Sequence, residues 1–341
     1  MRGPLDVERQ ACGRAFSSGR GGRDVEEARV RQVQDVPIVE VPDVVPRPRS
    51  IPSSILRAMR PLQWSKNVLV FAAAGAAGVL GEPAILWRAS LAFVAFSLIA
   101  SATYLVNDVL DARFDRLHPL KRFRPVACGE LTARTALVVS GVLFALGAAA
   151  SGVLGLRFVV VVAAYVAMSV TYSLRLKRVA VLEMAAVASG FVLRAVAGSA
   201  ATGVPPSAWF LILACSGAMF VVAGKRLADA HATGSNEERV EERTSDRPPY
   251  PVEFLRGAWV LAGGVTVTAY CLWAFAVPHT VDGIAWSQVS IVPFAIAIFR
   301  YAYAIELGGA GAPERLFLRD HVLEAITVAW VVVYALGVYL R

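Results

Sequence analysis

Three aspartates at helical spacing are the most chemically suggestive feature of this 341-residue sequence. Asp108, Asp111 and Asp115 stand at i, i+3 and i+7, so a helix would carry them on one face. They close a long apolar segment, where one charged group costs about 2.5–3.5 kcal/mol even on a lenient insertion scale. Carboxylates and substrate phosphates together are what Mg²⁺ prefers as ligands. The pattern therefore predicts a site for a divalent cation and phosphates at a membrane surface, with Asn107 as a further oxygen ligand or hydrogen-bonding group.

A basic cluster follows the aspartates within a few residues. Lys121, Arg122 and Arg124 can form charge-assisted hydrogen bonds with the anions that such a cation would also bind. The competing interpretation is a solvated helix end with surface carboxylates. The common register of the three acids and the cations that follow them favour the site.

A second short basic segment begins at Tyr172. Tyr172 and Lys177 could reach one phosphate from a short turn, the tyrosine as a hydroxyl donor and the lysine as a point charge. Aromatic and basic residues also anchor helices at membrane interfaces, and this segment alone would fit that interpretation. Glu183 follows near membrane depth, where it either joins a polar cavity or pairs with Lys177 or Arg178.

Two further groups of charges extend the candidate site. Arg194 lies near the middle of an apolar segment, where it could bind an anionic substrate or a buried carboxylate. Lys225 and Arg226 are candidate phosphate contacts, and Asp229 could contribute to a second metal ion.

The composition is that of a membrane protein. Hydrophobic residues make up 56% of the chain, charged residues 18%, and the mean hydropathy is +0.56, whereas a soluble domain carries about 25% charge. Apolar segments without the alternating polarity of barrel strands predict an all-α polytopic fold. Nine such segments are expected to span the bilayer: residues 67–81, 86–107, 133–154, 157–173, 180–200, 208–224, 257–277, 288–306 and 322–340.

The distribution of Lys and Arg predicts the orientation in the membrane. The loops at 107–130, 172–180, 224–256 and 306–321 hold sixteen of them, and the opposite loops hold only Arg88 and Arg157. This asymmetry places the N-terminus and the acidic motif in the cytoplasm, with the C-terminus outside, in a plasma (inner) membrane. The net charge of +8 is then mainly a topology signal, and nucleic acid is not expected as a partner.

The remaining segments have simpler interpretations. Residues 1–50 are rich in Arg, Gly and Pro and predict a disordered cytoplasmic extension ahead of a membrane domain over 55–341. The segment 231–251 suits either a mobile lid or a solvated loop, and 313–320 suits a short interfacial helix. The four cysteines and four histidines lack metal-ligand spacing, which argues against zinc chemistry.

Several motifs together resemble a known family. They are the Asn107–Asp115 run at the end of a transmembrane helix, the stretch from Arg60 to Asn67, the stretch from His118 to Pro125, Tyr172–Lys177, Ala188–Gly198 and Lys225-Arg226. In these features residues 55–341 are similar to the UbiA superfamily of intramembrane prenyltransferases. The detail resembles the branch of decaprenyl-phosphate phosphoribosyltransferases.

The resemblance implies a helical bundle with a central cavity that faces the cytoplasm, and Mg²⁺ as cofactor. It implies transfer of a phosphoribosyl group from phosphoribosyl pyrophosphate to decaprenyl phosphate, which yields a precursor of cell-wall arabinan. Asp108 and Asp111 would then hold Mg²⁺, and Asp115 would bind a second metal or orient a cation. Lys66 joins Tyr172 and Lys177 as an expected phosphate contact.

Two other functions stay open on the sequence. One is transfer of a prenyl group from its pyrophosphate to an aromatic acceptor, with the same fold and acidic motif. The other is a transporter, although the chain shows no internal repeat of the kind transporters often have. The isoprenoid length, the number of metal ions and a homo-oligomeric state are also left open.

Overall fold

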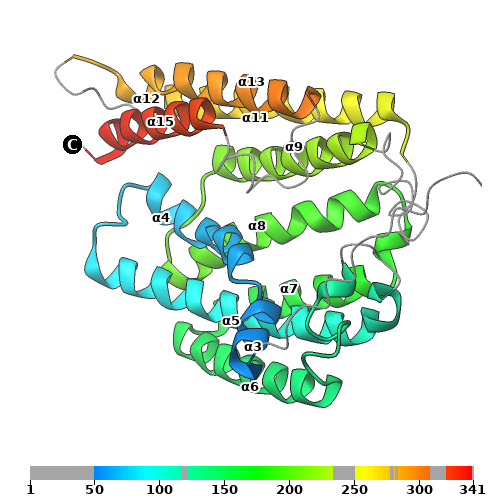
Figure 1. The fold of residues 1–341 in the computed structure, drawn as a ribbon. Coiled ribbons are helices and arrows are strands. Elements are labelled where there is room, and N and C mark those ends of the chain that lie inside the picture. The colour runs from blue at the N-terminus through cyan, green and yellow to red at the C-terminus, as the bar shows by residue number, and fades with distance from the viewer. Residues whose placement is uncertain are drawn as a thin grey trace, which may run out of the picture. The chain divides into compact units, whose positions relative to one another are not determined.

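The computed structural model describes residues 50–116, 121–232, 250–276, 280, 283–307 and 320–339. Within these ranges the regular elements are helices (Figure 1). In chain order they are α3 (Ile51–Met59), η1 (Pro61–Phe71), α4 (Ala72–Ala76), α5 (Pro83–Asp115), η2 (Lys121–Phe123), α6 (Ala133–Leu154), α7 (Leu156–Leu174), η3 (Leu176–Arg178), α8 (Leu182–Thr202), α9 (Ala208–Ala232), α11 (Val252–Ala276), α12 (Trp286–Val289), α13 (Ile291–Glu306) and α15 (His321–Tyr339).

Eight helices in the described part of the chain are long and apolar enough to cross a membrane. They correspond to eight of the nine predicted segments, with α12 and α13 together forming one of them. The all-α polytopic prediction is therefore confirmed. The predicted extension at 1–50, the candidate lid and the interfacial helix at 313–320 lie wholly or largely outside the described residues.

The predicted segment at 67–81 has a different form. It is covered by η1, a 3-10 helix of 11 residues, and by the 5-residue helix α4. The larger rise of a 3-10 helix gives these two elements a combined length of about 30 Å, which is the thickness of a bilayer core. η1 runs antiparallel to α5: Trp64 donates a hydrogen bond to Ser101, and Asn67, further along η1, donates one to Ser97, which lies earlier in α5. A ninth crossing by this irregular segment is therefore compatible with its length.

Local sequence explains where the long helices begin and end. Pro83 starts α5, and the Thr132 side chain caps α6 by accepting a hydrogen bond from the Thr135 amide. Gly155 separates α6 from α7 at a φ of 98°, and Gly203 ends α8 in the left-handed region. α5 continues past the predicted end at 107 and carries all three aspartates, so the acidic motif is helical as expected.

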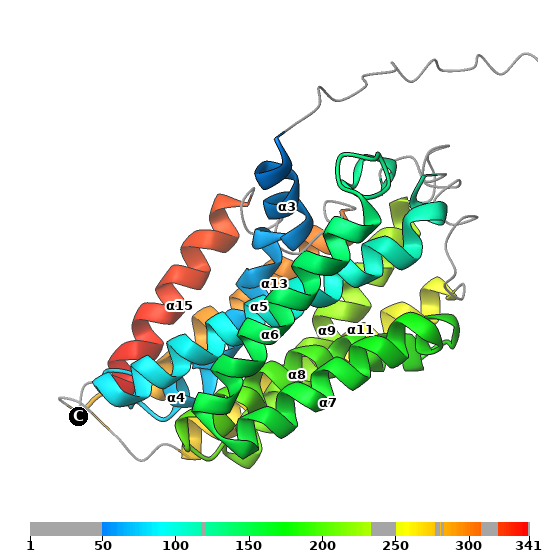
Figure 2. The same cartoon turned by 90° about the horizontal axis from the view of Figure 1, so that it is seen from below.

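Neighbouring helices pack mainly as antiparallel pairs. α5 packs on α6, α7 on α8 and α9 on α11, and each pair lies side by side in both Figure 1 and Figure 2. η1 packs on α8 at a very close approach, because a Cβ atom added to Gly198 would lie 1.8 Å from the carbonyl oxygen of Val70. The absence of a side chain at this position therefore allows η1 to pack this closely on α8.

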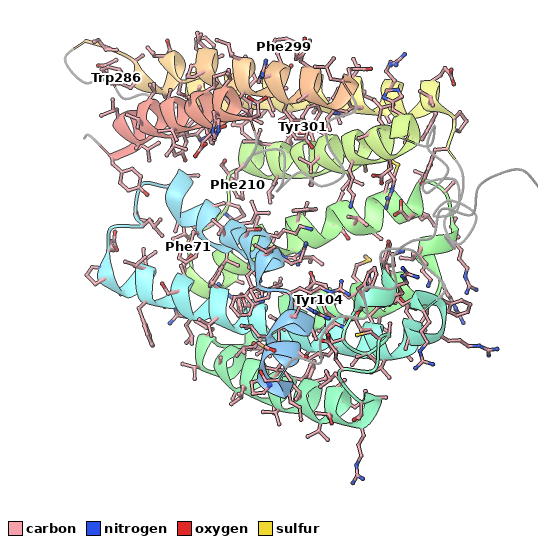
Figure 3. The ribbon with its side chains drawn as sticks, viewed as in Figure 1. Phe71, Tyr104, Phe210, Trp286, Phe299 and Tyr301 are labelled. Carbon is pink, nitrogen blue, oxygen red and sulfur yellow. The ribbon has the colours of Figure 1, made fainter. Side chains whose placement is uncertain are left out.

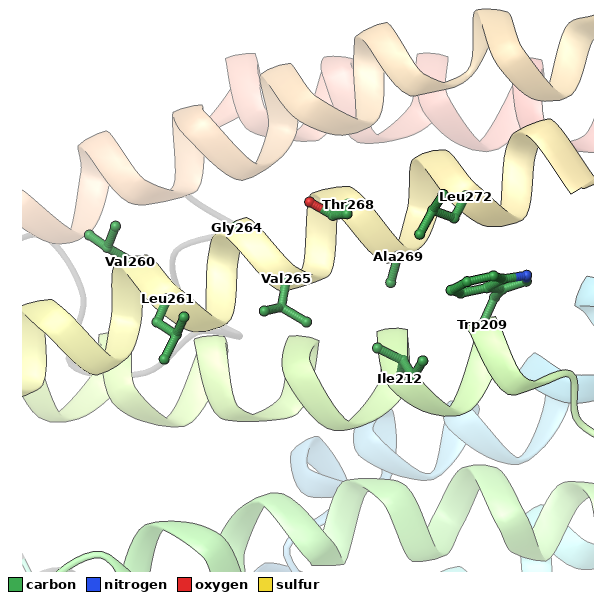
Figure 4. Close-up of a pocket in the computed structure, with 9 residues that line it drawn as sticks. All are labelled: Trp209, Ile212, Val260, Leu261, Gly264, Val265, Thr268, Ala269 and Leu272. Atoms are coloured by element: carbon green, nitrogen blue, oxygen red, sulfur yellow. The ribbon is translucent and has the colours of Figure 1, made fainter.

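A large apolar cavity lies among η1, α4, α8, α9, α11, α13 and α15. Its volume is about 670 Å³, and Phe210 and Tyr301, labelled in Figure 3, are among its lining residues. Of the described residues that line it, Lys66 alone carries a charge. A second space, the apolar groove of about 450 Å³ between α9 and α11, is lined by residues such as Trp209 and Leu272 (Figure 4).

Candidate active site

Asp108 and Asp115 are buried at the end of α5 and share an arginine. Their exposed fractions are 1% and 4%. Arg124 donates to Asp115 at 2.7 Å and to Asp108 Oδ1 at 3.3 Å. Arg60, at the end of α3, donates to the same oxygen of Asp108. Two of the three predicted acids are thus brought together by cations, as a charge in a low-dielectric site requires.

The third acid belongs to an adjoining polar network. Asn107 donates to Asp111 Oδ2 at 2.8 Å and accepts a hydrogen bond from Ser173 at 3.1 Å. Lys177 Nζ lies 4.0 Å from Asp111 Oδ1. Helices α5 and α7 and the short turn η3 therefore meet at Asp111. The structure places Asn107, Asp111 and Lys177 in one cluster, which joins two segments that are far apart in the sequence.

A second ion pair lies beyond Tyr172. Glu183 at the start of α8 is fully buried, and Arg226 of α9 donates to both of its carboxylate oxygens. Arg226 also contacts Asp229 at 3.3 Å, and the Tyr172 hydroxyl lies 3.5 Å from Glu183 Oε1. The structure thus shows Arg226 as a partner of Glu183, which the sequence alone did not suggest. Because Tyr172 precedes Ser173, the two networks are adjacent along α7.

The donor set at the end of α5 suits a hard divalent cation. Its ligands would be carboxylate oxygens, and Oδ2 of Asp108 is buried without a hydrogen-bond partner. Such an orphaned acceptor normally has an explanation, and a bound ion is one of them. The described residues include no three His, Cys, Asp or Glu side chains gathered as one metal site. Arg124 lies between Asp108 and Asp115, at the place that a metal ion would take if both carboxylates bound it.

The loop that carries the basic cluster is fastened to α3. Glu130 accepts a hydrogen bond from Ser54 at 2.9 Å and pairs with Arg57 at 3.0 Å, and Arg57 also donates to the Phe123 carbonyl at 2.8 Å. Within this loop Lys121 and Arg122 form η2 beside Arg124. The Arg122 guanidinium stacks on the Phe123 ring at 4.8 Å. The predicted basic residues are thus held at the same end of α5 as the acids.

Arg194 is buried among neutral groups. Its guanidinium donates to Asn67 Oδ1 at 2.7 Å, to the Gly190 carbonyl at 2.5 Å and to the Tyr165 hydroxyl at 3.0 Å. Since no carboxylate of the described residues pairs with it, the structure shows a neutral alternative to the two roles considered from the sequence. Arg194 joins η1, α7 and α8 at membrane depth.

The other predicted residues have partly different surroundings. Lys66 lines the apolar cavity, with its ammonium group 5.9 Å from the Phe191 ring centroid. Lys225 is partly buried and directly precedes Arg226 in α9. Their predicted phosphate contacts remain predictions.

Sequence reasoning gave no role to Arg60, Ser173, Asn67 or Tyr165. Arg60 has one sequence signal, because the following Pro61 disfavours a right-handed helical backbone and ends α3 there. Asn67 and Tyr165 have no such signal, since their importance depends on Arg194, which lies far from both in sequence. Only the packing of η1 and α7 on α8 brings the three together.

The fold is that of an intramembrane enzyme family, and the chain belongs to the UbiA prenyltransferase family, whose model matches residues 68–324. Similar proteins include the decaprenyl-phosphate phosphoribosyltransferase of Mycobacterium tuberculosis, 42% identical over 85% of this chain and 96% of that one. The enzyme of the same name from Corynebacterium glutamicum is 38% identical over 86% of this chain and 89% of that one.

Solved structures agree on the fold. A UbiA homologue from Archaeoglobus fulgidus bound to GPP and Mg²⁺ matches with a TM-score of 0.64 and 18% identity, over 84% of this chain and 100% of that one. The UbiA-type fold predicted from the sequence is therefore confirmed. Multi-pass membrane character follows from the same family membership and the eight apolar helices.

Proposed function

We propose that this protein transfers a 5-phosphoribosyl group from phosphoribosyl pyrophosphate to decaprenyl phosphate, releasing pyrophosphate. The observation that carries this proposal is the 42% identity, over nearly the whole of both chains, to an enzyme named for that activity. The product, decaprenylphosphoryl-5-phosphoribose, would supply arabinose donors for cell-wall arabinan.

The arrangement of charges supports a reaction with an anionic leaving group. As the anomeric C–O bond to pyrophosphate breaks, negative charge develops on the departing oxygens. A bound Mg²⁺ would supply Lewis-acid stabilisation of that charge, with Asp108 and Asp111 as its proposed protein ligands and Asp115 as a further candidate. Arg124, Lys121 and Arg122 would donate hydrogen bonds to phosphate oxygens at the same end of α5.

The acceptor phosphate, which is the nucleophile, needs no activation by the protein. An oxygen of the acceptor phosphate forms the new bond to the anomeric carbon, and it is already anionic. No general base is therefore required. The protein's task is to place two anionic substrates side by side, which cations such as Lys177 make electrostatically acceptable.

The apolar cavity supports a lipid acceptor. A polyprenyl chain has only apolar surface to bury, and a cavity of about 670 Å³ lined almost entirely by apolar side chains suits a segment of such a chain. Lys66 places one positive charge on the wall of this cavity, where it would attract the phosphate head group. We propose that the reaction takes place at the cytoplasmic face of the plasma membrane.

The test is transfer of radiolabel by the purified protein. Labelled phosphoribosyl pyrophosphate with decaprenyl phosphate and Mg²⁺ should yield a labelled lipid. A parallel reaction with a prenyl pyrophosphate and an aromatic acid should yield none. Activity in the second reaction alone would show an aromatic prenyltransferase, and uptake of the labelled anion into liposomes without a covalent product would show a transporter.

A further inference from the structure

Arg60 combines an unusual backbone with a contact to the acidic site. Its φ of 55° and ψ of 62° lie in the left-handed region, which side chains other than glycine adopt uncommonly. This turn ends α3, and the guanidinium contacts Asp108 and lies 5.0 Å from the Tyr104 ring centroid (Tyr104 is labelled in Figure 3). The fold therefore tolerates a disfavoured backbone at the position that supplies a counter-ion to Asp108.

The two carboxylate oxygens of Asp108 are paired unequally. Arg60 and Arg124 both donate to Oδ1, while Oδ2 has no partner and the side chain is 1% exposed. Arg124 is also engaged by Asp115, whereas Arg60 forms its ion pair, within the described residues, with Asp108 alone. The Arg60 side chain is 27% exposed, so solvent reaches it. Of these two arginines, Arg60 is the one whose departure would leave Asp115 neutralised.

We propose that Arg60 neutralises Asp108 in the substrate-free protein and exchanges that carboxylate for a phosphate oxygen of the donor when metal and diphosphate bind. This inference rests on the proposed function, because it takes a metal–diphosphate as the ligand. A diphosphate brings more negative charge than one divalent ion removes, so a released guanidinium has a partner at once. The planar fork of arginine suits phosphate as well as it suits carboxylate.

The exchange needs only a side-chain movement. α3 is held to the loop 121–131 by Arg57 and Ser54 through Glu130, so the backbone at Arg60 has a fixed anchor on its N-terminal side. Pro61 restricts the backbone on the other side. A side chain pivoting from this fixed turn would leave Asp108 without carrying α3 away from the site.

The exchange makes a thermodynamic prediction. Arg60 competes with the metal for Asp108 and assists the diphosphate, so it couples the binding of the two ligands. Removing it should tighten binding of the metal alone and weaken binding of the diphosphate, which an ordinary structural role would not do. Couplings between ligands commonly amount to about 5- to 150-fold in affinity.

The experiment measures Mn²⁺ binding by electron paramagnetic resonance in the detergent-purified full-length protein. Arg60→Asn is the main variant, because asparagine accepts a left-handed backbone better than most residues do. Without diphosphate, it should bind Mn²⁺ at least about threefold more tightly than the wild type, and with saturating Mn²⁺ it should bind inorganic pyrophosphate at least about fivefold more weakly. Unchanged or weakened Mn²⁺ binding in folded Arg60→Asn would overturn the proposal.

Two further variants complete the design. Arg60→Lys keeps a charge but lacks the fork, so it should bind pyrophosphate more weakly than the wild type even if Arg60→Asn fails to fold; wild-type pyrophosphate binding would overturn the proposal. Arg134→Gln removes an exposed arginine at the start of α6 and should leave both affinities unchanged. A shift in Arg134→Gln equal to that in Arg60→Asn would show a general charge effect and would also overturn it.

The proposed function can fail separately. Inorganic pyrophosphate contains no sugar, so the shifts in Arg60→Asn do not depend on which group is transferred. Shifted affinities in a protein that transfers no phosphoribosyl group would remove the substrate assignment and keep the exchange. Normal transfer by the wild type, with unshifted affinities in Arg60→Asn, would keep the substrate assignment and remove the exchange.

Discussion

At the scale of single residues, the candidate site depends on carboxylates whose burial is energetically unfavourable. Asp108 is buried at the end of a membrane helix and lies beside two arginines, and its second oxygen has no partner. A protein that gains nothing from such a group would be at least as stable with an apolar residue there. This cost is a reason to expect that Asp108 serves the chemistry rather than the fold.

Asp108→Asn and Asp111→Asn should each lower turnover by at least about 100-fold, the loss expected when a group that stabilises developing charge is removed. Both variants should stay folded, because asparagine keeps the size and one oxygen of each side chain. Rates of label transfer and size-exclusion profiles in detergent test this expectation. Near-wild-type rates in both variants would show that these carboxylates do not hold a catalytic metal.

The sequence predicted the acids and their basic neighbours but not how they pair. Helical spacing suffices to place Asp108, Asp111 and Asp115 on α5. The division into Asp108–Arg124–Asp115 and Asn107–Asp111–Lys177 depends on where the loop 121–131 and the turn η3 return to that helix, which no local pattern specifies. The roles predicted for Lys121, Arg122, Lys225 and Arg226 remain predictions for the same reason.

At the scale of elements, the irregular segment η1–α4 is the part of the fold that the sequence described least well. Its apolar residues predict a span, but the 3-10 geometry depends on contacts with α5 and α8, among them those of Asn67 and Gly198. The regular helices are easier to predict from the sequence, because residues such as Pro83, Thr132, Gly155 and Gly203 mark their ends.

Gly198→Ala should destabilise the protein by about 1–3 kcal/mol, the usual cost of overpacking, because the new Cβ would overlap the Val70 carbonyl. Thermal unfolding in detergent measures the effect. Gly141→Ala on α6 is the matched control, since nothing lies within 4 Å of the position that its new methyl group would take, and it should be neutral or stabilising. Gly198→Ala melting at or above the wild-type temperature would contradict the close packing of η1 on α8.

The start of α15 should give a measurable pH dependence. Asp320 accepts hydrogen bonds from Arg300 at 2.8 Å and from the amides of Val322 and Leu323, and the Arg300 bond is the main cause of its lowered pKa. A lowered pKa in the folded state contributes stability at pH values above the ordinary value of 3.8, and this contribution is lost as the pH falls through the lowered pKa. The melting temperature of Asp320→Asn should therefore lie below that of the wild type at pH 7, with the difference shrinking below pH of about 4. A difference independent of pH would contradict this assignment.

At the scale of the whole molecule, composition and charge asymmetry predicted a polytopic helical protein, and the family match and the eight apolar helices agree with it. Composition and charge asymmetry could not predict the cavity of about 670 Å³, because its walls come from seven elements spread over most of the chain. Orientation in the membrane rests on the charge asymmetry alone.

Orientation can be tested with single cysteines at opposite ends of α5 and α6. Arg134→Cys lies near the acidic end and Glu82→Cys precedes α5 at the other end, in a background from which all four native cysteines have been removed. A membrane-impermeant maleimide should label position 134 only in inverted vesicles and position 82 only in right-side-out vesicles. The opposite pattern would place the candidate site outside the cell.

The proposed chemistry requires that acids at the end of α5 hold a divalent ion which stabilises the departing diphosphate. The decisive assay is label transfer from phosphoribosyl pyrophosphate to decaprenyl phosphate by purified wild-type protein, first after exhaustive chelation and then as Mg²⁺ is restored. We predict no transfer in chelator and full recovery with Mg²⁺. Undiminished transfer under chelation would show that no divalent ion takes part.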